Sequence, residues 1–143
     1  MITELNEITS YHHPHVIKRF QKEFPQDSTR AEELFSDLMR FFWISKKHSL
    51  DRQTNTSNEE LNFTFIMDEE MNLIDKMWHV FLLYTEDYMD FCHRYFGEYL
   101  HHRPDIVPTM PQDPKLFEAN LEKFLAYTYD HLGENVVKRW FNA

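Results

Sequence analysis

Residues 71–104 read "MNLIDKMWHVFLLYTEDYMDFCHRYFGEYLHHRP", and this stretch decides the fold that the sequence predicts. Its first part, up to Tyr84, is apolar at nearly every position, which is typical of a helix that is enclosed on most sides. After Thr85, aromatic residues and Cys92 recur at spacings of three and four, which predicts a second helix with one inward face. The short link at Thr85 favours an antiparallel pair, so we expect these two helices at the centre of an all-α bundle.

Further helices are predicted on both sides of this pair. Before it, two segments that flank Pro25 have helical patterns of apolar residues. After it, Asp113 followed by Pro114 is a strong signal for the start of another helix. Together with an aromatic content of 16%, these patterns predict a single compact bundle of about five helices with an aromatic-rich core. The length is that of one domain, so residues 1–143 are expected to form a single helical domain.

Two long connections are expected between these helices. Residues 48–62 are polar, contain Ser, Asn and Thr and lack periodicity, which predicts an exposed loop. Residues 103–113 are rich in proline, which predicts a stiff, extended connector. The alternating segment "LNFTFIM" at 61–67 is expected to be extended coil, because the chain offers no second strand to pair with it.

The composition excludes several classes of protein. Two glycines are too few for the glycine-rich loops that bind nucleotide phosphates. The net charge of −9 and the lack of a basic stripe predict no nucleic-acid partner. No apolar run is long enough to span a bilayer and the first residues lack a secretory signal, so we expect no membrane partner. A single cysteine fits a reducing compartment, so a cytoplasmic location is expected.

Asp75 and His79 are the polar residues that stand out in the apolar segment. Four residues apart in a helix, they lie one turn apart on the same face, so their side chains can converge on one point. A buried carboxylate is costly unless a cation, hydrogen bonds or a metal compensates for its lost hydration. Two interpretations remain open: His79 alone pairs with Asp75, or both residues bind a metal ion.

The metal interpretation draws on further ligand types that follow in the chain. Imidazole, thiolate and carboxylate groups bind zinc and related divalent ions. Only one of the adjacent histidines 101 and 102 is expected to point inward, and a cysteine on an inward face often serves as a small apolar residue. The spacing is neither HExxH nor CxxC. The predicted metal ligands are Asp75, His79, Cys92, His101 and His102, with a divalent metal such as zinc as the cofactor.

A second histidine group lies near the N-terminus, at His12, His13 and His15. A solvated turn explains it, and adventitious metal binding is the alternative interpretation. The aromatic stripes elsewhere in the chain are interpreted as core and not as a ligand-binding box.

The central stretch also resembles a group of small uncharacterised bacterial proteins. They share Asp-x-x-Trp-His, then Tyr-x-x-Phe-Cys, a Phe-Gly and a closing His-His-x-Pro. More distantly, it is similar to the N-terminal region of plant glycine-rich domain proteins, which often carry a second histidine where this chain has Phe81. The resemblance implies a shared fold and a shared site, and it supplies no reaction. The matching residues are Asp75, Trp78, His79, Tyr88, Phe91, Cys92, Gly97, His101, His102 and Pro104.

Three functions are compatible with these observations. The first is a helical domain whose buried Asp, His and Cys residues bind a divalent metal, with an unknown reaction. The second is a metal-free protein-interaction module in which the same residues form a buried hydrogen-bond network. The third is a metal-free enzyme that uses His79 or Cys92 for acid–base or nucleophilic chemistry, although no orienting partner is identifiable. The sequence names neither a substrate nor a protein partner.

Overall fold

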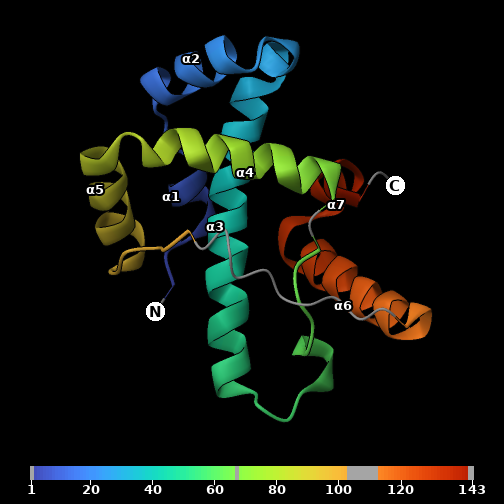
Figure 1. Ribbon diagram of the computed structural model, residues 1–143. Coiled ribbons are helices and arrows are strands. Elements are labelled where there is room, and N and C mark those ends of the chain that lie inside the picture. The colour runs from blue at the N-terminus through green and yellow to red at the C-terminus, as the bar shows by residue number, and fades with distance from the viewer. Residues whose placement is uncertain (1, 67, 103–112, 142–143) are drawn as a thin grey trace. The chain divides into compact units, whose positions relative to one another are not determined.

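The fold is all-helical over residues 2–66, 68–102 and 113–141, which are the residues that the computed structural model describes (Figure 1). None of these helices combines the length and the apolarity that a bilayer crossing needs. In these ranges there are seven α-helices, not about five. The two beyond the five described above are short: one at residues 5–9, which is too short to show a periodic pattern, and a terminal one at residues 134–141. The order is α1 (Leu5–Thr9), α2 (Pro14–Glu23), the 3-10 helix η1 (Pro25–Arg30), α3 (Ala31–Thr54), the 3-10 helix η2 (Glu59–Leu61), α4 (Glu69–Leu82), α5 (Thr85–Phe96), α6 (Pro114–Leu132) and α7 (Glu134–Phe141).

The chain divides into two compact units. The first consists of Met1–Trp43 and Asn72–Leu100, and the second of Ile44–Met71 and His101–Ala143. Helices α3 and α4 each contribute residues to both units. The single domain expected over residues 1–143 therefore stays a prediction.

The first unit has an aromatic core around Phe81 of α4. The ring of Phe81 packs edge-on against Tyr88 and Phe91 of α5, with centroid distances of 5.0 Å and 5.3 Å, and lies 5.8 Å from Phe35 of α3. All four side chains are almost completely buried. Edge-to-face ring pairs stabilise by about 0.5–1.5 kcal/mol each beyond the area that they bury. The aromatic-rich core that the composition predicts is confirmed.

Helix α5 leaves the end of α4 at a steep angle, so the two are not the antiparallel pair that the short link suggested (Figure 1). Only Leu83 and Tyr84 separate the two helices. Gly97 ends α5 in the left-handed conformation, with φ +70°, and its N–H donates to the carbonyl of His93 at 3.1 Å. Glycine adopts this conformation without the strain that a Cβ brings, so it reverses the chain after α5.

The second unit has an aromatic cluster of its own. The rings of Phe65 and Phe124 stack at 4.7 Å, and Phe63 lies 5.9 Å from Phe124. His48 of α3 stacks on Phe63 at 4.2 Å, and its Nε2–H donates to the carbonyl of Leu61 at 2.8 Å. This histidine therefore ties the end of α3 to the chain that follows η2.

Residues 62–66, which follow η2, are extended without forming a strand, as expected for this part of the segment. The side chain of Asn120 on α6 satisfies both backbone groups of Thr64: its Oδ1 accepts from the Thr64 N–H at 2.8 Å, and its Nδ2–H donates to the Thr64 carbonyl at 2.9 Å. An amide side chain here takes the place of a neighbouring strand.

The exposed loop predicted at 48–62 is wrong over much of its length. Helix α3 continues to Thr54, and residues 59–61 form η2. Asp51 holds the end of α3, because it accepts from the hydroxyl of Tyr127 at 2.7 Å and pairs with Lys47 at 3.3 Å. The partner on α6 is distant in sequence, so local polarity alone suggested a loop.

The connector predicted at 103–113 lies outside the described residues except for its last one. Asp113 caps α6, since its Oδ1 accepts from the N–H of Lys115 at 2.9 Å, and Pro114 is the first helical residue. The helix start that these two residues predict is therefore confirmed.

We expect His48 to make the stability depend on pH. Burial lowers the pKa of His48 below its ordinary value, so protonation disfavours the folded state. Stability should be full above about pH 6.5, the pKa in the unfolded chain, and should fall as the pH drops towards the folded pKa. Urea unfolding between about pH 7.5 and about pH 5 should show a flatter profile for His48→Gln than for the wild type.

The matched control is His93→Gln, which changes an exposed histidine of α5. It should keep the wild-type profile. Burial also lowers the pKa of His131, so part of the pH dependence should remain in His48→Gln. A profile for His48→Gln as steep as that of the wild type would contradict the role assigned to this residue.

Candidate functional site

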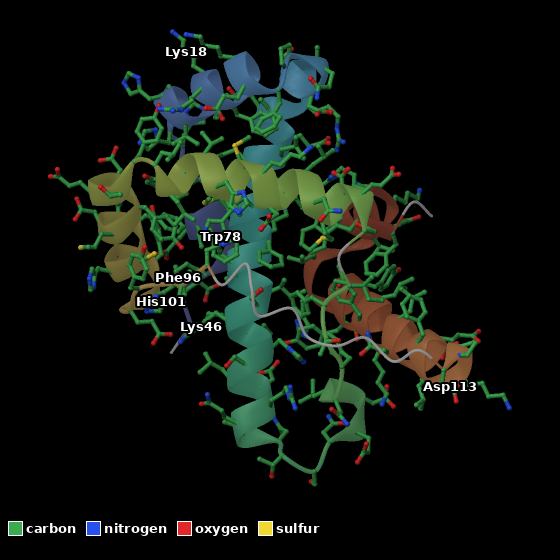
Figure 2. The ribbon with its side chains drawn as sticks, viewed as in Figure 1. Lys18, Lys46, Trp78, Phe96, His101 and Asp113 are labelled. Carbon is green, nitrogen blue, oxygen red and sulfur yellow. The ribbon has the colours of Figure 1, made fainter. Side chains whose placement is uncertain are left out.

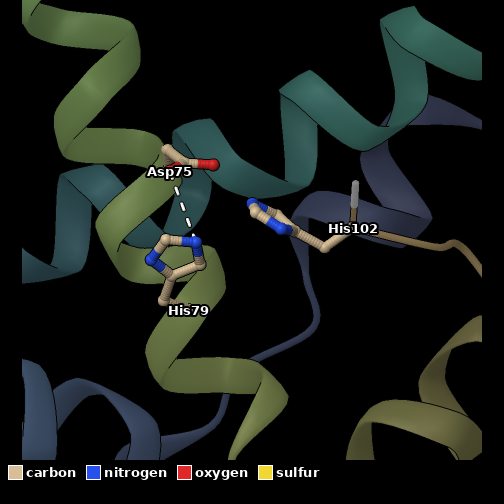
Figure 3. A group of neighbouring side chains, drawn as sticks. All are labelled: Asp75, His79 and His102. Atoms are coloured by element: carbon tan, nitrogen blue, oxygen red, sulfur yellow. Dashed lines mark ion pairs between the residues drawn. The ribbon is translucent and has the colours of Figure 1, made fainter. Parts of the chain in front are cut away.

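Asp75 and His79 lie one turn apart on α4, as their spacing predicts (Figure 3). His79 Nε2 is 3.5 Å from Asp75 Oδ2. The Asp75 side chain is 29% exposed and the His79 side chain 52% exposed. The two therefore form a partly solvated pair on the helix surface.

The burial predicted for this pair is wrong, and the reason is the amphipathic character of α4. Its core side is made by residues such as Ile74, Met77 and Phe81, which are almost fully buried. Asn72, Asp75, His79 and Leu83 recur at spacings of three and four, and they make a stripe that is exposed or half-buried. Exposed Leu83 made the helix look enclosed on that side, although the polar residues already marked the stripe.

Cys92 lies at the end of a hydrogen-bond network in the first unit. Its Sγ accepts from the backbone N–H of Leu100 at 3.5 Å. The hydroxyl of Tyr88 donates to the carbonyl of Leu100 at 2.5 Å. The indole Nε1–H of Trp78, labelled in Figure 2, donates to the same hydroxyl oxygen at 3.0 Å. The network therefore joins α4, α5 and the chain that follows Gly97.

Burial keeps the titratable members of this network neutral. It raises the pKa of the Cys92 thiol and that of the Tyr88 phenol above their ordinary values. A neutral thiol is neither the nucleophile nor the metal ligand that a thiolate is. Among the described residues, Cys92 also belongs to no group of three potential metal ligands. The contacts of Cys92 are those of a packed, hydrogen-bonding side chain.

His101 and His102 differ in exposure. His101 is exposed and His102 is half-buried, in line with the expectation that only one of them points inward. In the described part of the chain, His101 belongs to no group of three potential ligands. His102, which Figure 3 also draws, offers one imidazole nitrogen of the kind that metals bind, as His79 does, and Asp75 offers one carboxylate oxygen.

The histidines near the N-terminus have separate roles. His13 is buried and caps α2: its Nδ1 accepts from the N–H of Val16 at 3.2 Å, and its Nε2–H donates to Asp87 Oδ2 at 2.7 Å. His12 and His15 are exposed. The solvated turn predicted for this group is therefore wrong for His13, because its partner Asp87 lies on α5 and no local pattern indicates it.

Asp37 of α3 is a buried carboxylate that the sequence analysis missed. Its side chain is completely buried and accepts from Arg40 Nη1 at 2.7 Å. The available signal was the arginine three residues later, which is a common spacing for helix pairs. Burial of the carboxylate itself has no local signature, because it depends on what packs over α3.

Residues 3–120 match the sequence model of the UCP032817-like family. The chain belongs to this family. The matched span of the UCP032817-like sequence includes α4, α5 and His102, and so contains the whole hydrogen-bond network and the Asp75–His79 pair. No curated protein and no solved structure matches the chain. The likeness to small uncharacterised bacterial proteins, and the more distant one to plant glycine-rich domain proteins, stays a prediction.

The exposure of the pair predicts a small effect of Asp75→Ala on stability. A partly solvated pair at i,i+4 contributes about 0.3–0.5 kcal/mol, so the free energy of unfolding without metal should change by less than about 1 kcal/mol. Asp37→Ala is the matched comparison and should lose more, about 1–3 kcal/mol, because its buried hydrogen bonds are lost. Chemical denaturation with EDTA present measures both. A larger loss for Asp75→Ala than for Asp37→Ala would contradict the surface position of the pair.

Proposed function

We propose that this protein binds a divalent metal ion such as zinc through Asp75, His79 and His102. The observation that carries the proposal is the accessible pair on α4, in which a carboxylate oxygen and an imidazole nitrogen lie 3.5 Å apart. Two ligands at about 2.0–2.1 Å from a zinc ion lie about 3.3 Å apart in a tetrahedral site. The helix therefore presents two ligand atoms at almost the separation that one ion requires.

His102 is the third proposed ligand because the chain restricts its position. It follows Leu100 by two residues, and two residues span at most about 7 Å. Both backbone groups of Leu100 are held by side chains of α5, through Tyr88 and Cys92. Trp78, the residue before His79, donates to the same Tyr88 hydroxyl. The covalent tether thus favours His101 and His102 over more distant histidines, and of these two only His102 is half-buried.

The half-exposed setting of the pair supports binding from solution. A divalent ion can reach the α4 stripe directly, and neutral imidazole and carboxylate are ligands that zinc accepts. Three protein ligands leave a fourth position for water or another molecule, which is the arrangement of catalytic and not of structural zinc sites. The cytoplasmic location stays a prediction.

The second candidate function is a metal-free interaction module. It is favoured by the Trp78, Tyr88 and Cys92 network, which satisfies its polar groups without any metal, and by exposed apolar side chains in the same unit. Leu83 is 57% exposed at the end of α4, and Met89 is 49% exposed on α5. Exposed apolar side chains are typical of surfaces that bind another protein.

Metal titration of protein purified without an affinity tag tests the first proposal. Zn²⁺ and Co²⁺ should bind with about one ion per chain, and Asp75→Ala, His79→Ala and His102→Ala should each weaken binding about tenfold or more. Removing the metal with EDTA should lower the melting temperature of the wild type and leave that of His79→Ala unchanged. Binding should weaken below about pH 6, since a protonated imidazole cannot bind a metal.

His93→Ala is the matched control, because it removes an exposed histidine from the unit that contains Asp75 and His79. Its metal affinity should equal that of the wild type, and so should that of His101→Ala. If the protein takes up less than about a tenth of an equivalent of zinc, manganese and iron, the metal proposal is wrong and the interaction module stands in its place.

A further inference from the structure

A chain of two hydrogen bonds links α4 to Leu100, the residue that precedes the two histidines. Trp78 stands between Asp75 and His79 in the sequence, and its ring lies 5.0 Å edge-on from Phe42 of α3. Its indole nitrogen can only donate, so the oxygen of Tyr88 must be the acceptor. The single hydroxyl hydrogen of Tyr88 is then directed to the carbonyl of Leu100.

The buried surroundings of Tyr88 allow its hydroxyl only this one arrangement of hydrogen bonds. Tyr88 is 1% exposed, and its ring packs edge-on against Phe81 at 5.0 Å and against Tyr99 at 5.4 Å. No water is needed to complete the bonds of its hydroxyl, because one donor and one acceptor are already in place. Loss of this hydroxyl would leave both the Trp78 N–H and the Leu100 carbonyl without this partner.

Leu100 is therefore held at two points. Its carbonyl accepts from Tyr88 and its N–H donates to the sulfur of Cys92, so both of its backbone polar groups are bound by side chains of α5. Gly97 turns the chain at the end of α5, and three residues later Leu100 is anchored. The chain that leads to His102 therefore starts from a fixed point.

We infer that Trp78 and Tyr88 are positioning residues for His102 in the proposed metal site. The inference rests on the proposed function and adds the device that controls the third ligand. Trp78 lies on the same helix as Asp75 and His79, and its N–H donates to the Tyr88 hydroxyl. That hydroxyl in turn donates to the carbonyl of Leu100 and so holds Leu100 in place. Neither residue binds the metal; each restricts where His102 can be.

Cobalt titration of Tyr88→Phe tests the inference, because cobalt reports both affinity and ligand geometry through its visible absorption. Loss of a group that orients a ligand weakens metal binding about 10–100-fold, and Tyr88→Phe should show a loss in that range. Its cobalt spectrum should shift to that of His102→Ala. The matched control is Tyr127→Phe in the second unit, which removes another buried phenol, one that donates to Asp51 at 2.7 Å. That control should keep the wild-type affinity and spectrum.

Two further variants separate positioning from general destabilisation. Insertion of two glycines between Leu100 and His101 leaves the hydrogen bonds of Tyr88 intact and lengthens the tether, so its cobalt affinity should also fall to that of His102→Ala. Combining Tyr88→Phe with His102→Ala should cause no further loss, because the two changes remove the same contribution.

The outcomes distinguish this inference from the proposed function. If the wild type binds no cobalt, the proposed site is wrong and the inference falls with it. If the wild type binds cobalt through Asp75 and His79, and both Tyr88→Phe and the glycine insertion keep its affinity and spectrum, the site stands and the positioning role is overturned. If Tyr88→Phe fails to fold, the glycine insertion alone decides between these results.

Discussion

The hydroxyl of Tyr88 is the group on which the first unit most depends. It accepts from Trp78 of α4 and donates to the backbone of Leu100, while its ring forms part of the aromatic core. Because it is almost fully buried, neither bond can be exchanged for a bond to water without opening the core. One side chain therefore sets both the packing of α5 on α4 and the path of the chain after α5.

Unlike the buried Tyr88 hydroxyl, the Asp75–His79 pair is partly exposed to solvent. A partly solvated pair on a helix surface adds little to stability, so its presence is poorly explained as a device for folding. A carboxylate and an imidazole held one turn apart are, however, an economical way to present two ligand atoms to an ion. The core and the pair thus use different faces of α4: apolar residues such as Met77 and Phe81 face inward, and Asp75 and His79 lie on the half-solvated stripe.

In the second unit, polar side chains bind backbone groups in the way that a neighbouring strand or helical turn otherwise does. Asn120 satisfies the backbone of Thr64, and His48 satisfies the carbonyl of Leu61, so an extended segment packs against helices without a neighbouring strand. Each such side chain is buried or half-buried and bound to a partner distant in sequence. Burial favours the neutral form of His48, which makes the structure around it sensitive to acid.

Local chemistry was enough to determine the helical class, the aromatic core and several helix ends. Asp113 with Pro114 starts a helix and Gly97 ends one, because capping and left-handed backbone depend on neighbours within a few residues. The turn-to-turn relation of Asp75 and His79 also follows from helix geometry alone. These features could be predicted from the sequence because short-range forces decide them.

Tertiary packing alone decided which polar groups are buried. Asp75 and His79 looked enclosed and lie on a half-solvated stripe, whereas His13 was predicted in a solvated turn and is buried. Asp37 is buried too, and no sequence pattern had singled it out. The extent of α3 was likewise missed, because its end is held by the distant Tyr127. Sequence periodicity shows which residues share a helix face. What covers that face is settled by contacts between residues far apart in the chain, and these leave no local pattern.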